Sequence, residues 1–247
     1  MQEETVPEGK LRQEAFRFPG RWVGGTSMIL APLLLLAGIL LRMHYPFFYT
    51  YQLTAFREQP ALITTSYSLF ALGNVLLGPA IITLAQRIGT RRPVWAVWGA
   101  TLTLLGLFAR TFHAGVDHLA FQLTRSESLE EATRQIGDAY GAFHVFHAFN
   151  LFILCGWIVL AAGAYLSRTL GLIGAIALAL MSVLMIGVLK GTGITSIIAA
   201  AGLCIALLPL GIKVLCEGPR PSFRSLTGWL LLLAALGYLC YFLGEKG

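Results

Sequence analysis

Two short stretches of this sequence bring histidines close to other polar side chains. They contain Arg110, His113, Asp117 and His118 in the first, and Tyr140, His144 and His147 in the second. If each stretch is helical, the first places Arg110, His113 and Asp117 on one stripe about 60° wide, and the second forms a similar stripe. Histidine changes protonation near neutral pH and is the commonest metal ligand in proteins. The two stripes are therefore the predicted functional site.

The residue types favour a metal site in this place. Neutral imidazoles and a carboxylate suit zinc, iron or copper, and a metal with an open coordination position activates water for hydrolysis. The sequence therefore predicts a metal-dependent membrane hydrolase or transferase that acts on a lipid-linked or amphiphilic substrate. In this interpretation the predicted metal ligands are His113, His118, His144 and His147, and the predicted catalytic residues are Asp117, Arg110 and Tyr140.

Other interpretations use the same residues and stay open at this point. A transporter, exporter or resistance-type membrane protein would use the histidines and Asp117 as a proton relay or substrate site. A b-type haem protein would ligate its iron with one histidine from each of two helices, and Arg110 would meet a propionate. In a purely structural interpretation, His113 and Asp117 at i,i+4 stabilise each other's burial.

Composition shows what kind of element must hold these residues. The chain has 247 residues, of which 56% are hydrophobic and 12% charged, and its mean hydropathy is +0.72. A soluble domain carries about 25% charged residues. Apolar runs of about 20 residues, long enough to span a bilayer, occur at 22–43, 61–86, 94–121, 139–166, 169–189, 194–213 and 226–243.

The expected fold is therefore all-α: a polytopic bundle of about seven transmembrane helices. We expect a single bundle over 22–243, preceded by a cytoplasmic segment over 1–21. Consecutive antiparallel helices usually pack side by side, so the two polar stripes, on the third and fourth runs, are expected to face each other or a shared cavity.

Charge predicts how the bundle lies in the membrane. With a cytoplasmic N-terminus, the inside segments hold eleven Lys and Arg residues and the outside segments six, which fits the positive-inside bias. All five histidines then lie toward the outer face of a plasma membrane. The net charge of +6 is explained by cytoplasmic loops facing anionic lipid, with no need for a nucleic-acid partner. The lipid bilayer is the expected partner, and the oligomeric state is left open.

The outer connection 122–138 has a helix signal of its own. Ser128 and Glu131 have the spacing of a capping box, and Leu129, Ala132 and Ile136 then recur at helical spacing. This pattern predicts a short amphipathic helix over the outer face of the bundle.

Overall fold

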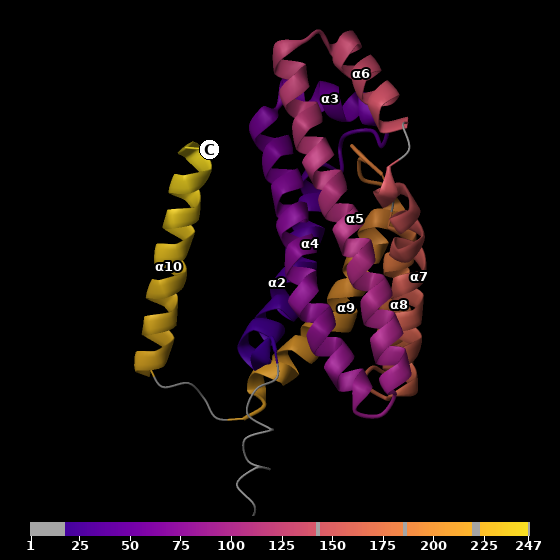
Figure 1. Cartoon of the computed structure of the whole chain (residues 1–247), viewed down its shortest axis with the longest axis vertical. Coiled ribbons are helices and arrows are strands. Elements are labelled where there is room, and N and C mark those ends of the chain that lie inside the picture. The colour runs from indigo at the N-terminus through magenta and orange to yellow at the C-terminus, as the bar shows by residue number, and fades with distance from the viewer. Residues whose placement is uncertain (1–17, 142–143, 185–186, 219–222, 247) are drawn as a thin grey trace, which may run out of the picture. The chain divides into compact units, whose positions relative to one another are not determined.

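A computed structural model describes residues 18–141, 144–184, 187–218 and 223–246. The chain forms two compact units, which divide between Leu215 and Cys216. The first unit contains the helices α2 (Gly20–Leu41), α3 (Tyr49–Glu58), α4 (Pro60–Gly89), α5 (Pro93–Ser126), α6 (Leu129–Gly141), α7 (Val145–Leu166) and α8 (Leu172–Ala179), the 3-10 helix η1 (Leu180–Val183) and α9 (Ile194–Cys216) (Figure 1). The second unit contains α10 (Phe223–Lys246).

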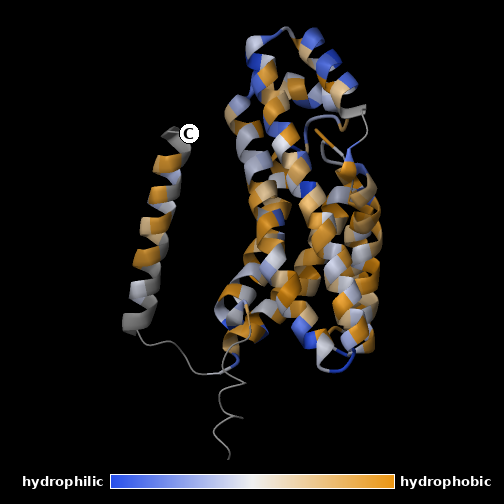
Figure 2. Cartoon of the chain, viewed as in Figure 1, coloured by the Kyte–Doolittle hydropathy of each residue, from blue (hydrophilic) through white to orange (hydrophobic). Residues whose placement is uncertain are grey.

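Five of the described helices are long and apolar enough to cross a membrane: α2, α4, α5, α7 and α9. Hydrophilic residues of the first unit gather toward the two ends of the bundle, and its middle is mainly hydrophobic (Figure 2). Many large apolar side chains of these helices are exposed, among them Leu30, Val75, Phe108 and Leu151. Length, composition and exposed apolar surface together indicate a multi-pass helical membrane protein.

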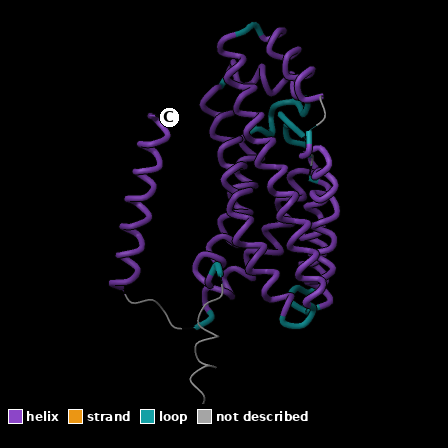
Figure 3. Tube along the Cα trace, in the orientation of Figure 1, coloured by secondary structure: helices purple, strands orange, loops and turns teal. Residues whose placement is uncertain are grey.

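The predicted fifth span, 169–189, is not a single helix. The 3-10 helix η1 ends at Val183, and the described residues 184 and 187–193 are not helical. Gly187 and Leu189 have left-handed backbone angles, with φ of 117° and 51°, and such angles cannot continue a right-handed helix. We refer to this irregular stretch as segment 184–193, of which 185 and 186 lie outside the described residues. Loop backbone lies between helices on the side of the unit that carries α3 and α6 (Figure 3).

The predicted seventh span falls in α10, where the described residues include the apolar stretch Ala234–Leu243. The described part of the chain therefore supports five full-length spans, and the prediction of about seven is not confirmed.

The predicted fourth span, 139–166, is also divided. Helix α6 ends at Gly141, and α7 begins at Val145 after His144, which has an extended backbone (φ −144°, ψ 155°). Tyr140 therefore belongs to α6, and the prediction that it shares a helical stripe with His144 and His147 is wrong. A helical stripe exists only within one continuous helix, and glycine, here at 141, is a common residue at helix ends.

The spanning elements of the first unit contact one another in a ring. Helix α2 packs against α4, α4 against α5, α5 against α7, and α7 against α8. Glycines mark the remaining contacts: a Cβ on Gly202 of α9 would lie 2.7 Å from the Ala177 carbonyl oxygen of α8, and one on Gly211 would lie 2.9 Å from Met28 Cβ of α2. Small residues let membrane helices approach this closely.

Two hydrophobic clusters fill the unit. The larger includes Met28, Leu77, Trp157 and Leu203, and the smaller includes Leu53, Phe56, Phe121, Ile136 and Leu189. The smaller cluster joins the ends of the long helices to α3 and α6, so these two short helices are packed parts of the bundle.

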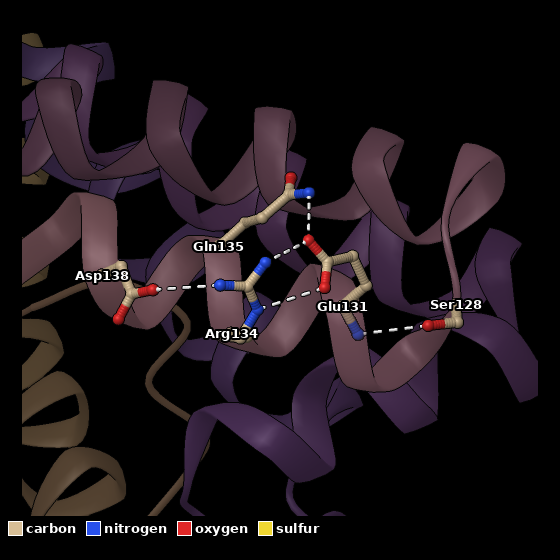
Figure 4. A network of polar contacts seen from close by, with 5 residues as sticks. All are labelled: Ser128, Glu131, Arg134, Gln135 and Asp138. Atoms are coloured by element: carbon tan, nitrogen blue, oxygen red, sulfur yellow. Dashed lines mark hydrogen bonds and ion pairs between the residues drawn. The ribbon is translucent and has the colours of Figure 1, made fainter.

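Helix α6 begins with the contact expected of a capping box: the Glu131 N–H donates to Ser128 Oγ at 3.1 Å. On its exposed face, Arg134 donates to Glu131 at 2.7 Å and lies 3.8 Å from Asp138 (Figure 4). Hydrogen bonds from Arg134 and then from Gln135 hold the pKa of Glu131 below its ordinary value. Its other face buries Ala132 and Ile136.

Candidate functional site

A cavity of about 200 Å³ lies where the two hydrophobic clusters meet. Its walls come from α2, α3, α4, α5, α9 and segment 184–193. Apolar lining comes from both clusters and their neighbours, including Ile39, Phe56, Phe70 and Phe121. The ionisable side chains at its walls are Arg42, Tyr67, Arg110, His113, Asp117, His118 and Lys190.

Helix α5 supplies three buried members of this group, Arg110, His113 and Asp117. Their spacings of three and four residues place them on one face of α5, and this face points toward the cavity. His118 also lines the cavity but is exposed. The structure therefore brings together the predicted residues of the first stretch.

Side chains from this face hold the backbone of segment 184–193. The Leu189 N–H donates to the Asp117 carboxylate at 2.5 Å, and Arg110 donates to the Leu184 carbonyl at 3.0 Å. From α4, the Tyr67 hydroxyl lies 3.4 Å from the Lys190 carbonyl oxygen and 3.2 Å from Gln52 Oε1, and its one proton can be donated to either. Irregular backbone within a membrane is tolerated only where protein or a polar cavity provides hydrogen-bond partners for its N–H and C=O groups. These side chains provide such partners for the backbone of segment 184–193.

Gly191 fixes the same segment from the other side. Its N–H donates to the Phe47 carbonyl at 2.9 Å, and a Cβ there would lie 2.6 Å from Gln52 Nε2 and 2.8 Å from Phe47 Cα. A larger residue at 191 would therefore push the segment away from α3 and the chain before it. The fully buried Gln52 in turn donates to the Pro46 carbonyl at 2.7 Å, and its Oε1 lies 3.2 Å from the Tyr67 hydroxyl.

Arg42 is a cavity residue that the sequence interpretation counted only as a loop charge. It follows α2 directly, is buried, and donates to Ser66 Oγ at 3.3 Å. Its guanidinium carbon lies 4.3 Å from the centroid of the Tyr67 ring and 5.1 Å from that of Phe70. The available signal was its position at the end of an apolar run, inside the predicted span 22–43.

The four predicted metal ligands lie in two places. His113 and His118 are on α5, but five residues of helix rotate one about 140° away from the other. His144 and His147, at the start of α7, have ring centroids 5.9 Å apart and do not line the cavity. Phe112 lies between the two places, with its ring centroid 4.9 Å from that of His144.

Within the described residues, no group of three or more His, Cys, Asp or Glu side chains is placed to hold a metal ion. The predicted gathering of His113, His118, His144 and His147 around one ion is therefore not seen in this arrangement. The side chain of Tyr140, predicted as catalytic, lies outside the described part of the structure.

Comparison of the chain with known protein families, with characterised proteins and with solved structures finds no match. Any functional conclusion therefore depends on the cavity and the residues around it.

Proposed function

We propose that this protein is a membrane hydrolase or transferase that takes a lipid-linked or small amphiphilic substrate into the cavity. His113 and Asp117 are the proposed proton-transferring side chains. One observation carries the proposal: two buried groups suited to acid–base chemistry share a cavity with apolar walls. Such a cavity receives the apolar part of an amphiphile against its walls and leaves the polar part beside the acid–base groups.

The positions of the two side chains fit these roles. His113 and Asp117 are one helical turn apart, so they are neighbours on the surface of α5. The Asp117 carboxylate is held in place by the Leu189 N–H. A positioned histidine or carboxylate transfers protons efficiently when it lies within reach of the reacting group. In a hydrolase His113 would accept the proton of the attacking water and pass it to the leaving alcohol as the ester or phosphoester bond of the substrate breaks. In a transferase the attacking group would be an alcohol in place of water.

A metal-dependent form of the proposal would use His113, His118, His144 and His147 around a zinc, iron or copper ion. It requires the start of α7 to approach the cavity wall of α5. The b-type haem hypothesis likewise requires one histidine from each of these helices to face a common space.

Segment 184–193 favours a second candidate function, a transporter or exporter. Interrupted helices whose irregular backbone lines a cavity are a common way to build substrate sites in transporters. Here Arg110 and Asp117, which would act as substrate or proton site, also contact that backbone. The same cavity would then open alternately to each side of the membrane.

The proposed location is the plasma membrane, and the proposed orientation places the N-terminus in the cytoplasm. The last turn of α4 carries Arg87, and the short turn after it carries Arg91 and Arg92. The positive-inside bias places these arginines on the cytoplasmic side. The end that carries α3 and α6, and the cavity near it, would then face outward.

Chromogenic amphiphiles test the enzymatic proposal. Purified protein in neutral detergent is mixed with 4-nitrophenyl octanoate and, separately, with octyl 4-nitrophenyl phosphate, and release of nitrophenol is followed. We expect turnover of at least one compound, and a fall of about 100-fold or more in H113Q because general acid–base catalysis contributes that much.

His44 provides the matched control, because it is exposed, lies at the same end of the bundle and does not line the cavity. H44Q should keep full activity. Equal activity of H113Q and the unaltered protein would contradict the role of His113. Absence of turnover, combined with uptake of a labelled amphiphile into proteoliposomes, would select the transporter.

A further inference from the structure

The cavity has an excess of positive charge. Its lining includes the three cations Arg42, Arg110 and Lys190 but one carboxylate, Asp117. With neutral histidines this leaves two positive charges without a balancing negative charge at the cavity wall. A charge held away from water in a membrane protein is costly unless it has a partner. The composition of the cavity therefore points to an anionic ligand.

Arg42 gives the most direct support. Only 4% of its surface is exposed, its ring contacts are with Tyr67 and Phe70, and its hydrogen bond goes to the neutral Ser66. Its Nε is buried and has no hydrogen-bond partner among the described residues. The described part of the chain also shows no ion pair for Arg42 or Lys190. A buried guanidinium that lines a cavity and has no carboxylate partner among the described residues is suited to bind an oxyanion.

The carboxylate in the cavity forms no ion pair with Arg42 among the described residues. One oxygen of Asp117 accepts the Leu189 N–H from segment 184–193. Lys190 belongs to the same segment, and its Nζ lies 5.4 Å from the centroid of the Phe47 ring. The three cations therefore approach from three elements: the end of α2, the middle of α5 and segment 184–193.

The type of cation and the size of the cavity narrow the ligand. A guanidinium presents a planar set of donors that matches the oxygens of a phosphate, and a lysine adds a compact point charge. Sites that enclose drug-sized ligands have about 300–1,000 Å³. A cavity of about 200 Å³ therefore encloses a head group and the first part of an attached chain, and it leaves the rest of the chain outside.

We infer that the cavity binds the phosphate group of an amphiphilic substrate through Arg42, Arg110 and Lys190. This inference rests on the proposed function and adds its substrate class. The phosphate lies among the three cations, and the apolar part of the substrate extends along Ile39, Phe70 and the neighbouring apolar lining.

Binding to purified protein in neutral detergent tests the inference with defined compounds. The first is dioctanoyl phosphatidic acid, and the second is dioctanoyl glycerol, which has the same chains but no phosphate. We expect the phosphatidic acid to bind at least about tenfold more tightly, since hydrogen bonds to charged groups contribute that much. Competition by inorganic phosphate and by glycerol phosphate then shows whether the bound phosphate group comes from a lipid head group or from free phosphate. Displacement at similar concentrations would assign the site to free phosphate and overturn the amphiphilic part of the inference; weak displacement would assign the site to a lipid head group and support the inference.

Variants of the cavity-lining cations test whether phosphatidic acid binds in the cavity. R42Q and K190M should each weaken the binding of phosphatidic acid by about tenfold. R57Q is the matched control, because Arg57 is an exposed cation on α3 that does not line the cavity. The affinity of R57Q for phosphatidic acid should equal that of the unaltered protein. Size-exclusion profiles show whether R42Q folds, and the comparison of the two lipids on the unaltered protein needs no variant.

Equal affinity for the two lipids, unchanged in K190M, would overturn the phosphate inference and leave the proposed function standing. If neither lipid binds and the chromogenic assay shows no turnover, both the phosphate inference and the proposed enzymatic function are overturned.

Discussion

The Asp117 carboxylate lies between the cavity and the backbone of segment 184–193, so a structural and a chemical role meet in one side chain. The D117N substitution keeps a carbonyl oxygen that accepts the Leu189 N–H, but it removes the negative charge and the proton-transferring group. We expect D117N to unfold thermally near the temperature of the unaltered protein and to lose about 100-fold or more in activity.

The D117A substitution separates the two roles. It leaves the buried Leu189 N–H without its acceptor, at a cost of about 1–3 kcal/mol, so both the unfolding temperature and the activity should fall. If D117N instead lost stability and activity in the same proportion as D117A, the residue would be structural only. Fluorescence-detected thermal unfolding in detergent, run beside the chromogenic assay, provides both readouts.

The metal hypothesis is also decided by individual side chains. If His113, His118, His144 and His147 close around one ion, gently purified protein should hold about one equivalent of zinc, iron or copper. Occupancy should fall as the pH drops through the histidine range, because only neutral imidazole coordinates. Elemental analysis at two pH values measures this, and less than about a tenth of an equivalent at the higher pH would reject it. An intense absorption band near 400 nm would instead indicate haem.

Sequence periodicity grouped Arg110, His113 and Asp117 because all three belong to one continuous helix. It could not find Arg42 as a site residue or place Lys190 beside Arg110, since both reach the cavity from elements far away along the chain. Only the packing of α2 and segment 184–193 against α5 brings these cations to the same cavity.

At the scale of elements, composition identified the apolar runs but not where each helix stops. The run 169–189 is mainly apolar, yet the described residues of its last part are irregular. Asp117 and Arg110 bond the backbone of this part, and Tyr67 contacts the Lys190 carbonyl directly after it. Those partners come from other helices, so a local pattern carries no sign of them.

The contact between α5 and α7 depends on a missing side chain. A Cβ on Gly156 would lie 2.6 Å from the Thr103 nitrogen and 2.8 Å from the Leu102 carbonyl carbon, both backbone atoms. G156V must therefore separate the two helices, and overpacking of this kind costs about 1–3 kcal/mol. We expect a lower unfolding temperature and a lower yield of monodisperse protein.

Gly115 serves as the control, because a Cβ there would meet nothing within 4 Å. G115V introduces the same residue into α5 and tests helix propensity without the contact. Equal unfolding temperatures for G156V and G115V would contradict the close packing of α5 on α7.

At the scale of the whole molecule, orientation decides which compartment the cavity serves. In a variant with its native cysteines replaced, S126C reports on the end with α3 and α6, and T90C on the opposite end; both positions are exposed. An impermeant maleimide should label S126C on intact cells and T90C only after permeabilisation. The reverse pattern would place the N-terminus outside and overturn the charge argument.

The central claim is that the cavity is where an amphiphilic substrate binds, and protection of a cysteine inside it tests this most directly. Ser68 lines the cavity and is accessible, whereas Ser126 is exposed and lies outside it. Maleimide labelling of S68C and S126C is timed with and without dioctanoyl phosphatidic acid. We predict that the lipid slows labelling of S68C severalfold and leaves S126C unchanged. Unchanged labelling of S68C at lipid concentrations that saturate binding would contradict the claim.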